Sequence, residues 1–254
     1  MHGDADIAAV GALVSDPARA RILLALGDGR ALPASVLADE AGVATSTASA
    51  HLGKLLDGGM LDVEQHGRHR YYRVSKPEVG ELLEALARLA PAEPVRSLRQ
   101  GTKAQALRFA RTCYDHLAGV LGTQLMAALL ERGVLSGGDG VFDPDRARQD
   151  RLSAPGFDFD YRLTARGIEE MQAFGIDFDS LPRRRSLIRY CVDWSAQRHH
   201  LSGALGAAVA ERMLELGWVS RGRHSRALVV SDHGREGLEQ TFGVRLSVST
   251  SQPY

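Results

Sequence analysis

Residues 37–56 read LADEAGVATSTASAHLGKLL, and this segment predicts the fold of the N-terminal part of the chain. Its first half has the composition of a short helix that ends in a turn at Gly42. A second helix follows, with Thr45 or Ser46 as its cap and leucines such as Leu52 along its apolar side. A helix, a tight glycine turn and a helix that opens with small polar residues form a helix-turn-helix arrangement.

The second helix of this pair has a polar face suited to the major groove of DNA. Its side chains can donate hydrogen bonds to phosphates or to base edges. They are Thr45, Ser46, Thr47, Ser49, His51 and Lys54. The alanines at 48 and 50 keep the helix narrow enough to lie deep in a groove. We therefore predict that this helix reads double-stranded DNA.

Two segments after this helix, residues 60–65 and 70–74, alternate between apolar and polar side chains as strands do. The turn between them, residues 66–69, is basic. The predicted DNA contacts on this hairpin are Arg68, His69 and Arg70. A basic hairpin directly after a recognition helix is a wing. Helices are also predicted through Ile7, Val10 and Leu13, from Pro17 behind a Ser15 or Asp16 cap, and after Pro77.

The segment from residue 15 to about residue 89 resembles the ArsR-type (arsenic-repressor-like) winged-helix regulators. The matching pieces are SDPARARIL at 15–23, LADEAGV at 37–43, STASAHL at 46–52 and GGML at 58–61. The resemblance implies a homodimer, with the first and last helices of the segment at its interface, and a pseudo-palindromic operator. Ala50 departs from the pattern, because many relatives have a basic residue there. The helix therefore offers fewer phosphate contacts, and we expect Arg68 and Arg70 of the wing to contribute more of them.

The sensor residues of this family are missing from the resembling segment. Metal sensors of the family use a cysteine pair on the helix before the recognition helix, or His/Asp pairs on the dimer helix. The first of these sites corresponds here to Pro33 and Ser35, which cannot bind a soft metal. The last helix, residues 78–89, has no histidine. Any signal must therefore be sensed in the rest of the chain.

The second half of the chain matches itself. Residues 111–122 (RTCYDHLAGVLG) correspond to RYCVD at 189–193 and HLSGALG at 200–206, with an insertion between the last two. We expect two winged-helix-like repeats at 105–178 and 179–246, like the fused C-terminal portion of some long ArsR-like proteins. A DNA-binding and dimerisation domain at 1–90, a linker at 91–104 and a tail at 247–254 complete the prediction. The fold class is mainly α with small β-hairpin wings (α+β). Neither repeat has a polar recognition helix, so neither is expected to bind DNA.

Cysteine, aspartate and histidine recur at matching places in the two repeats. The candidate metal ligands are Cys113, Asp115, His116, Cys191, Asp193 and His200. We expect Cys113 and His116 to lie one helical turn apart, so that both can face the same way. Thiolate, imidazole and carboxylate together suit zinc or another thiophilic divalent metal. Core packing is the commoner role of such residues; among specific signals a metal ion is favoured, and the regulator is expected to be a repressor.

Other interpretations of these residues stay open. Buried cysteines are common core residues, and Arg111 and Asp115 would form a simple i,i+4 pair on a helix. The thiols could sense oxidants or electrophiles, or a small organic effector could bind between the repeats. We also expect His199 to lie on the surface, Trp194 to plug the repeat interface and the basic run at 183–185 to be solvated.

Composition limits the class of protein. The 254 residues carry 31 basic and 31 acidic side chains, so any positive surface is local and the nucleic-acid argument depends on the motif. Two cysteines make no disulfide framework. No secretory signal or membrane-spanning run is seen, which predicts a cytoplasmic protein. No phosphate loop or nucleophile motif is found, so we expect no enzyme. A protein-interaction module would be distinguished by its lack of salt-dependent DNA binding.

Overall fold

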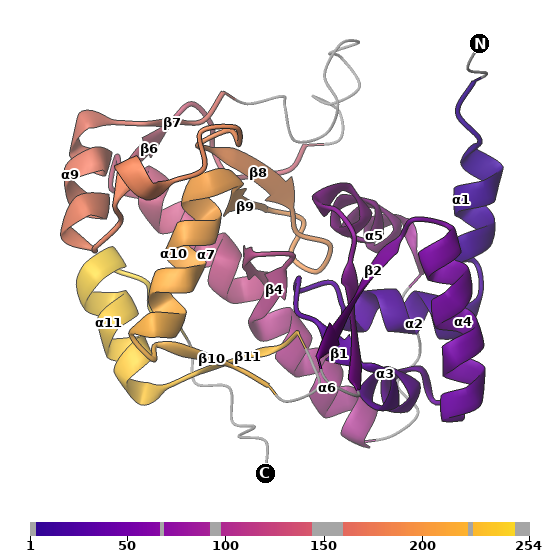
Figure 1. The fold of residues 1–254 in the computed structure, drawn as a ribbon. Coiled ribbons are helices and arrows are strands. Elements are labelled where there is room, and N and C mark those ends of the chain that lie inside the picture. The colour runs from indigo at the N-terminus through magenta and orange to yellow at the C-terminus, as the bar shows by residue number, and fades with distance from the viewer. Residues whose placement is uncertain (1–3, 67–68, 92–97, 144–159, 223–225, 247–254) are drawn as a thin grey trace. The chain divides into compact units, whose positions relative to one another are not determined.

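The computed structural model describes residues 4–66, 69–91, 98–143, 160–222 and 226–246. The chain divides into two compact units. The first runs to Leu86 and includes a short stretch ending at Arg226, and the second holds the rest. Both combine helices with small antiparallel sheets (Figure 1). This confirms the predicted α+β class. No helix in the described part of the chain is long and apolar enough to cross a bilayer.

The first unit is a winged helix-turn-helix. Its helices are α1 (Ile7–Val14), α2 (Pro17–Ala25), α3 (Ala34–Ala41), α4 (Thr45–Asp57) and α5 (Pro77–Leu89). Its strands β1 (Leu32–Pro33), β2 (Leu61–His66) and β3 (His69–Val74) form one antiparallel sheet in the order β1-β3-β2. As predicted, Asp16 caps α2, because its carboxylate accepts a hydrogen bond from the Arg19 amide at 2.9 Å. Ile22 and Leu23 of α2 pack into the core of this unit.

The turn between α3 and α4 follows the prediction, but the cap does not. Gly42 ends α3 with a left-handed φ of 69°, a conformation that glycine adopts without strain. The residue before α4 is Ala44, and no side chain caps this helix. The expectation that Thr45 or Ser46 caps it is therefore wrong. The backbone enters the helix one residue earlier, which places both hydroxyl side chains in its exposed first turn.

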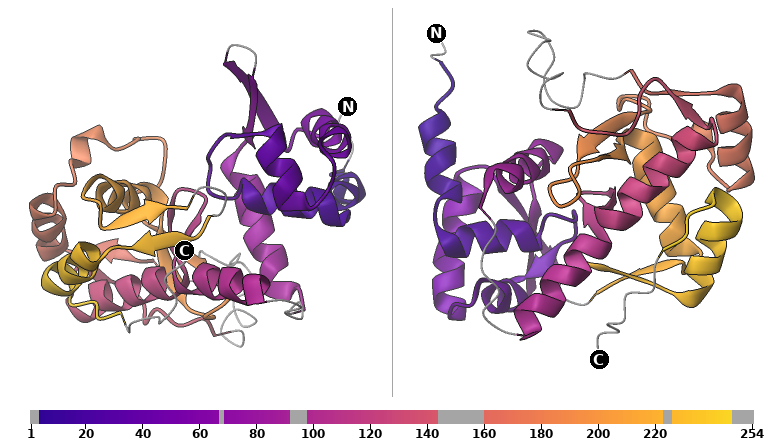
Figure 2. Two further views of the ribbon diagram at one scale, coloured as in Figure 1. Left: turned by 90° about the horizontal axis from the view of Figure 1, so that it is seen from below. Right: turned by 180° about the vertical axis from the view of Figure 1, so that it is seen from behind.

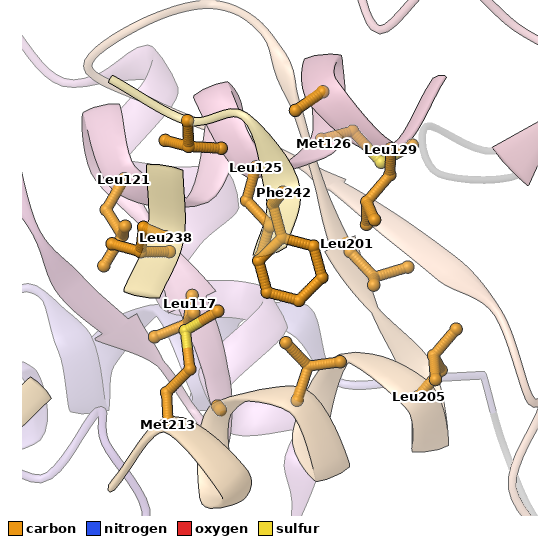
Figure 3. Close-up of a cluster of buried hydrophobic side chains, with 14 of the residues drawn as sticks. Leu117, Leu121, Leu125, Met126, Leu129, Leu201, Leu205, Met213, Leu238 and Phe242 are labelled. Atoms are coloured by element: carbon orange, nitrogen blue, oxygen red, sulfur yellow. The ribbon is translucent and has the colours of Figure 1, made fainter. Parts of the chain in front are cut away.

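The second unit begins with α6 (Leu98–Phe109), which starts inside the segment predicted as a linker. Further elements are β4 (Arg111–Cys113), β5 (His116–Ala118), α7 (Gly119–Glu131), β6 (Leu135–Ser136), β7 (Arg162–Leu163), α9 (Ala165–Ala173), the 3₁₀ turn η1 (Phe178–Ser180), β8 (Arg189–Val192), β9 (His199–Ser202), α10 (Gly203–Glu215), β10 (Val219–Arg221), β11 (Leu228–Val230) and α11 (Asp232–Phe242). A hairpin, a long helix, a second hairpin and a second helix thus follow one another twice (Figure 2). Apolar side chains of both copies, including Leu125, Leu205 and Phe242, share one core (Figure 3).

The first segment of each copy is a hairpin. The expectation that Cys113 and His116 lie one turn apart on a helix is wrong, because they end β4 and begin β5. Tyr114, with φ 58°, and Asp115 form the two-residue turn between them. Positive φ in the turn suits a tight hairpin and cannot continue a right-handed helix. Two residues that would share a helix face are instead opposite each other on adjacent strands.

Candidate DNA-binding surface and metal site

Helix α4 presents most of the predicted DNA-contacting residues on its exposed side. Thr45, Ser46, Thr47, Ser49 and Lys54 are all exposed. The hydroxyl of Ser49 donates to the Thr45 carbonyl oxygen within the helix, at 2.9 Å. A polar, uncrowded helix face of this kind can approach base edges and phosphates.

His51 differs from the other predicted contacts on α4. Its side chain is only 16% exposed, and its Nδ1 lies 3.7 Å from a carboxylate oxygen of Asp16. It follows the buried Ala48 by three positions and therefore lies at the edge of the packed face. The expectation that His51 belongs to the exposed face is not met.

The wing pairs β2 with β3 in a register that places Gln65 opposite Arg70. Arg70 is exposed. Arg73 on the same strand forms an ion pair with Glu64 at 2.9 Å. Of the other two predicted wing contacts, Arg68 lies outside the described residues, as does the side chain of His69.

Each of the two hairpins in the second unit carries one cysteine and one histidine at the same place. Cys113 on β4 is the register partner of His116 on β5, and Cys191 on β8 is the register partner of His200 on β9. Directly opposite residues of an antiparallel pair project from the same face of the sheet. Each hairpin thus presents a cysteine–histidine pair.

The two pairs meet in one buried cluster. One ligand atom from each of Cys113, His116, Cys191 and His200 lies within 4.8 Å of the others. The two histidines and Cys113 are at most 4% exposed, and Cys191 is half-buried. The imidazole rings are stacked, with centroids 5.2 Å apart. Four of the six residues predicted as metal ligands are therefore brought together.

The aspartates lie beside the cluster, and each faces a histidine ring. Asp115 Oδ1 is 3.2 Å from His116 Nδ1, and both Asp115 oxygens accept hydrogen bonds from Arg185. Burial alone would raise the pKa of Asp115, but His116 and Arg185 lower it to about 2. The expectation of a solvated basic run fails at Arg185, which is half-buried in this ion pair.

Asp193 is completely buried and has several hydrogen-bond donors. Its Oδ2 accepts from Arg111 Nη2 at 2.9 Å and from the Gly119 amide at 2.6 Å, while its Oδ1 accepts from Ser195. Burial would raise its pKa, but Arg111 is the leading one of several groups that lower it to about 2. Because Arg111 lies on a strand, the i,i+4 arrangement with Asp115 does not apply.

The protonation of the cluster is set by its own members. Burial disfavours the charged form of His116, but Cys191 and Asp115 raise its pKa to about 9. The neighbouring Cys113 and His116 lower the pKa of the Cys191 thiol. A thiolate beside an imidazolium is the electrostatic arrangement that these contacts favour.

Three buried ring nitrogens of the cluster have no partner at hydrogen-bond geometry among the described residues, although Cys191 is close enough to both rings for them to lower the pKa of its thiol. They are His116 Nε2 and both nitrogens of His200. Buried polar atoms in folded proteins are nearly always paired, since an unpaired one costs about 1–3 kcal/mol. An ion bound between the four side chains would satisfy such atoms.

Comparison with known proteins agrees with the N-terminal architecture. A helix-turn-helix domain family matches residues 14–64. The HTH-type transcriptional regulator YdfF of Bacillus subtilis (strain 168) is 38% identical over 242 residues, covering 95% of this chain and 99% of the relative. The chain belongs to the HTH-type transcriptional regulators.

Solved structures similar to this regulator each cover about a third of it. NolR from Sinorhizobium fredii is 24% identical, with a TM-score of 0.32, over 37% of this chain and all of NolR. The homodimeric DNA-binding domain of Mb0332 from Mycobacterium bovis, a possible ArsR-family regulator, is 30% identical, with a TM-score of 0.30, over 35% of this chain and 88% of its own. The cadmium sensor CMTR from Mycobacterium tuberculosis is 31% identical, with a TM-score of 0.27, over 36% of this chain and 99% of CMTR.

Two glycines of the regulator allow the cluster to form, and sequence reasoning did not single them out. A Cβ on Gly122 of α7 would lie 2.4 Å from the Leu117 carbonyl oxygen and 3.4 Å from His200 Cβ. A Cβ on Gly206 of α10 would lie 2.7 Å from the Leu201 oxygen and 3.4 Å from His116 Cβ. Each long helix thus packs closely on its own hairpin and on the histidine of the other copy. The two glycines occupy matching positions in the two repeats, and this is the sequence signal that could have identified them.

The insertion in the second repeat ends in a buried residue, although Gln197 and Arg198 within it are exposed. His199, expected on the surface, is 2% exposed, and its Nδ1 lies 2.7 Å from the Tyr161 hydroxyl oxygen. That expectation is wrong because His199 is part of β9, which packs against α7. Trp194 lies over the Arg111 guanidinium, 4.7 Å from the ring centroid to Cζ.

A cavity of about 450 Å³ lies beside the cluster. Asp115 and Arg185 line it together with residues of α10 such as Ala207 and Glu211. A small organic effector, which is one of the alternative signals, would have room there.

Proposed function

We propose that this regulator is a homodimeric repressor that binds a pseudo-palindromic operator under the control of a metal ion. The ion is a thiophilic divalent cation, zinc by preference, held by Cys113, His116, Cys191 and His200. Helix α4 and the wing contact DNA, and the cluster in the second unit receives the signal.

The exposed polar face of α4 supports the DNA-reading part of the proposal. Ser46 and Thr47 lie in its first turn with their side chains in solvent. Arg70 adds a positive charge on the wing. Helices in this arrangement contact base edges with their N-terminal residues, while basic residues on the wing contact phosphates.

An apolar helix with no buried residue supports the homodimer. Helix α1 reads IAAVGALV, and none of its residues is buried. Ile7 is 79% exposed and Val10 38%. An apolar helix face in solvent favours association with a second copy of the same surface, which a twofold-symmetric operator also requires.

The observation that carries the metal assignment is the cluster of four ligand atoms within 4.8 Å, together with its unpaired ring nitrogens. A tetrahedral zinc ion with two sulfur and two nitrogen ligands separates them by about 3.3–3.8 Å, from bond lengths of about 2.0–2.3 Å. The ligand atoms would therefore have to approach by only about 1 Å. Side-chain rotation can supply a movement of that size.

The ligand types support the choice of ion. Two thiolates and two imidazoles suit zinc, and they are poor ligands for magnesium or calcium, which bind oxygen. Four protein ligands complete a tetrahedral shell and leave no position for a substrate. A site of this kind suits a structural or sensing role.

Elemental analysis tests the metal assignment. After reconstitution and removal of loose metal, we expect one zinc ion per chain, and a cobalt-substituted protein should show thiolate-to-cobalt charge-transfer absorption. Cys113→Ser and Cys191→Ser should each lose the metal, whereas His233→Gln, on an exposed residue of α11, should retain it. A wild-type protein that binds no zinc under these conditions would refute the assignment.

Selection of DNA from a random pool of duplexes tests the operator. We expect the full-length regulator to enrich an inverted repeat, and its affinity should fall steeply with salt. A reporter placed behind the selected duplex should be repressed. Enrichment of no common sequence would contradict a specific operator.

The two thiols support a second candidate, an oxidant-responsive regulator. Their sulfur atoms belong to the same cluster. Hydrogen peroxide would take two electrons and two protons from the pair, leaving a disulfide and two molecules of water. If peroxide changes operator affinity in the wild type but not in Cys113→Ser, while zinc changes nothing, this candidate replaces the metal sensor.

A further inference from the structure

We infer that Arg111 is a positioning residue that couples the metal site to helix α6, through His200 and Asp193. This inference rests on the proposed metal site. It adds the series of contacts through which metal binding would affect residues outside the cluster. Its evidence is a continuous series of contacts inside the second unit, from the His200 ring to a backbone carbonyl of α6.

The first contact joins His200 to Asp193. Nδ1 of His200 lies 3.8 Å from Asp193 Oδ2, too far for a hydrogen bond, and both groups are completely buried. A metal ion on the other ring nitrogen, Nε2, makes the Nδ1–H group a stronger donor. Carboxylates commonly accept this proton from metal-bound histidines. Metal binding therefore favours closure of the gap between His200 and Asp193.

The second contact joins Asp193 to Arg111. The oxygen that faces His200, Oδ2, also accepts from Arg111 Nη2 at 2.9 Å and from the Gly119 amide at the start of α7. The interior here is closely packed, and Arg111 has no exposed surface. A shift of Asp193 toward His200 must therefore be accompanied by a shift of the guanidinium or by loss of a hydrogen bond.

The third contact joins Arg111 to α6. Its Nη1 donates to the carbonyl oxygen of Leu107 at 3.2 Å. Leu107 is in the last turn of α6, where carbonyl groups have no partner within the helix. Helix α6 is the first element of the second unit, so it follows the winged-helix unit in the chain. Arg111 thus bonds to the metal-facing carboxylate and to this helix at once.

The other histidine provides a matched comparison. His116 is held by Asp115, and Asp115 by Arg185, in the same order of imidazole, carboxylate and guanidinium. The hydrogen bonds described for Arg185 go to Asp115, and none reaches α6. Substitutions on this side should affect metal affinity without affecting transmission to α6.

A thermodynamic cycle on the full-length protein tests the inference. The affinity for a duplex selected from a random pool is measured by fluorescence anisotropy, with zinc at buffered concentrations and with zinc removed. Metal binding should change wild-type operator affinity by about 5- to 150-fold, as for other coupled sites. In Arg111→Lys, which retains the charge opposite Asp193, this factor should fall to about twofold or less, because one ammonium group cannot replace the fork that bonds to Asp193 and Leu107.

The comparison variants are Asp115→Asn and Arg185→Gln. At saturating zinc they should retain the wild-type coupling factor, while zinc affinity of Asp115→Asn falls by about 10- to 100-fold. Asp193→Asn should lose coupling as Arg111→Lys does. Hydrogen exchange of residues 98–109 gives a readout without DNA. Zinc should slow it in the wild type and leave it unchanged in Arg111→Lys.

The outcomes separate this inference from the proposed function. Wild-type coupling in both Arg111→Lys and Asp193→Asn, or equal loss of coupling in Arg185→Gln, would overturn the role of Arg111. If wild-type protein binds zinc without any change in operator affinity, the proposed sensing function fails. Hydrogen exchange in α6 then still tests whether Arg111 couples the metal site to this helix. If wild-type protein binds no zinc, the metal site itself fails and this inference with it.

Discussion

At the scale of single residues, the Cys/His cluster depends on two neighbouring glycines as well as on its four candidate ligands. Gly122 and Gly206 let two helices approach the backbone of their own hairpins. The same approach brings each glycine against the histidine of the other repeat. Any side chain at these positions would press on backbone, which cannot move aside as a flexible side chain can. These two glycines therefore determine where the histidine rings lie.

Gly206→Ala tests this steric role. The added methyl group would lie 2.7 Å from the Leu201 carbonyl oxygen, so α10 or β9 must shift and carry the His116 contact with it. We expect a loss of about 1–3 kcal/mol in stability, as for other overpacked sites, and weaker zinc binding in competition with a chelator. Gly53→Ala is the control, because no atom lies within 4 Å of its new methyl group. Unchanged zinc affinity and unfolding midpoint in Gly206→Ala would contradict the prediction.

At the scale of elements, the two binding surfaces are built in different ways. The recognition helix is a local structure, set by a glycine turn and an apolar stripe that a reader of the sequence can see. The metal cluster needs two hairpins, each of which supplies only half of the ligands. The wing is built from two strands that follow from local alternation, and its proposed contact with DNA involves exposed side chains such as Arg70.

Arg70→Ala tests the wing. An exposed arginine that contacts phosphate adds affinity without sequence preference, so the variant should bind selected and random duplexes more weakly by the same factor, with a salt slope reduced by about 1. Arg73→Ala is the matched control on the same strand, since Arg73 pairs with Glu64 and should add little. A loss confined to the selected duplex would assign Arg70 to base reading instead.

At the scale of the whole molecule, the proposed function assigns DNA reading and metal sensing to different units. The winged-helix unit lacks the metal-binding residues of the family that it resembles, and the second unit contains the buried Cys/His cluster. Two copies of the chain would place two recognition helices on one operator. Occupancy of two metal sites would then act on a single DNA complex.

The double substitution Ile7→Glu and Val10→Glu tests the proposed dimer. Both side chains are exposed in the single chain, so the substitution should leave its folding unchanged. Two added charges on each α1 would repel a second copy, and the protein should elute as a monomer in size-exclusion chromatography with light scattering. Val229→Glu, at a residue of β11 that is 45% exposed, should remain a dimer. A dimeric double variant would place the interface elsewhere.

The winged helix, the wing and the residue types of the Cys/His cluster could be predicted from the sequence alone. These follow from local patterns: the glycine turn at Gly42, the alternation of two strands and the recurrence of cysteine and histidine. The hairpin that holds Cys113 and His116 could not be predicted, because their spacing suits a helix turn as well as a two-residue β-turn. Nor could it be predicted that Asp115 and Asp193 lie beside the cluster or that His199 is buried. Those outcomes depend on contacts between segments far apart in the chain, whose packing no local pattern records.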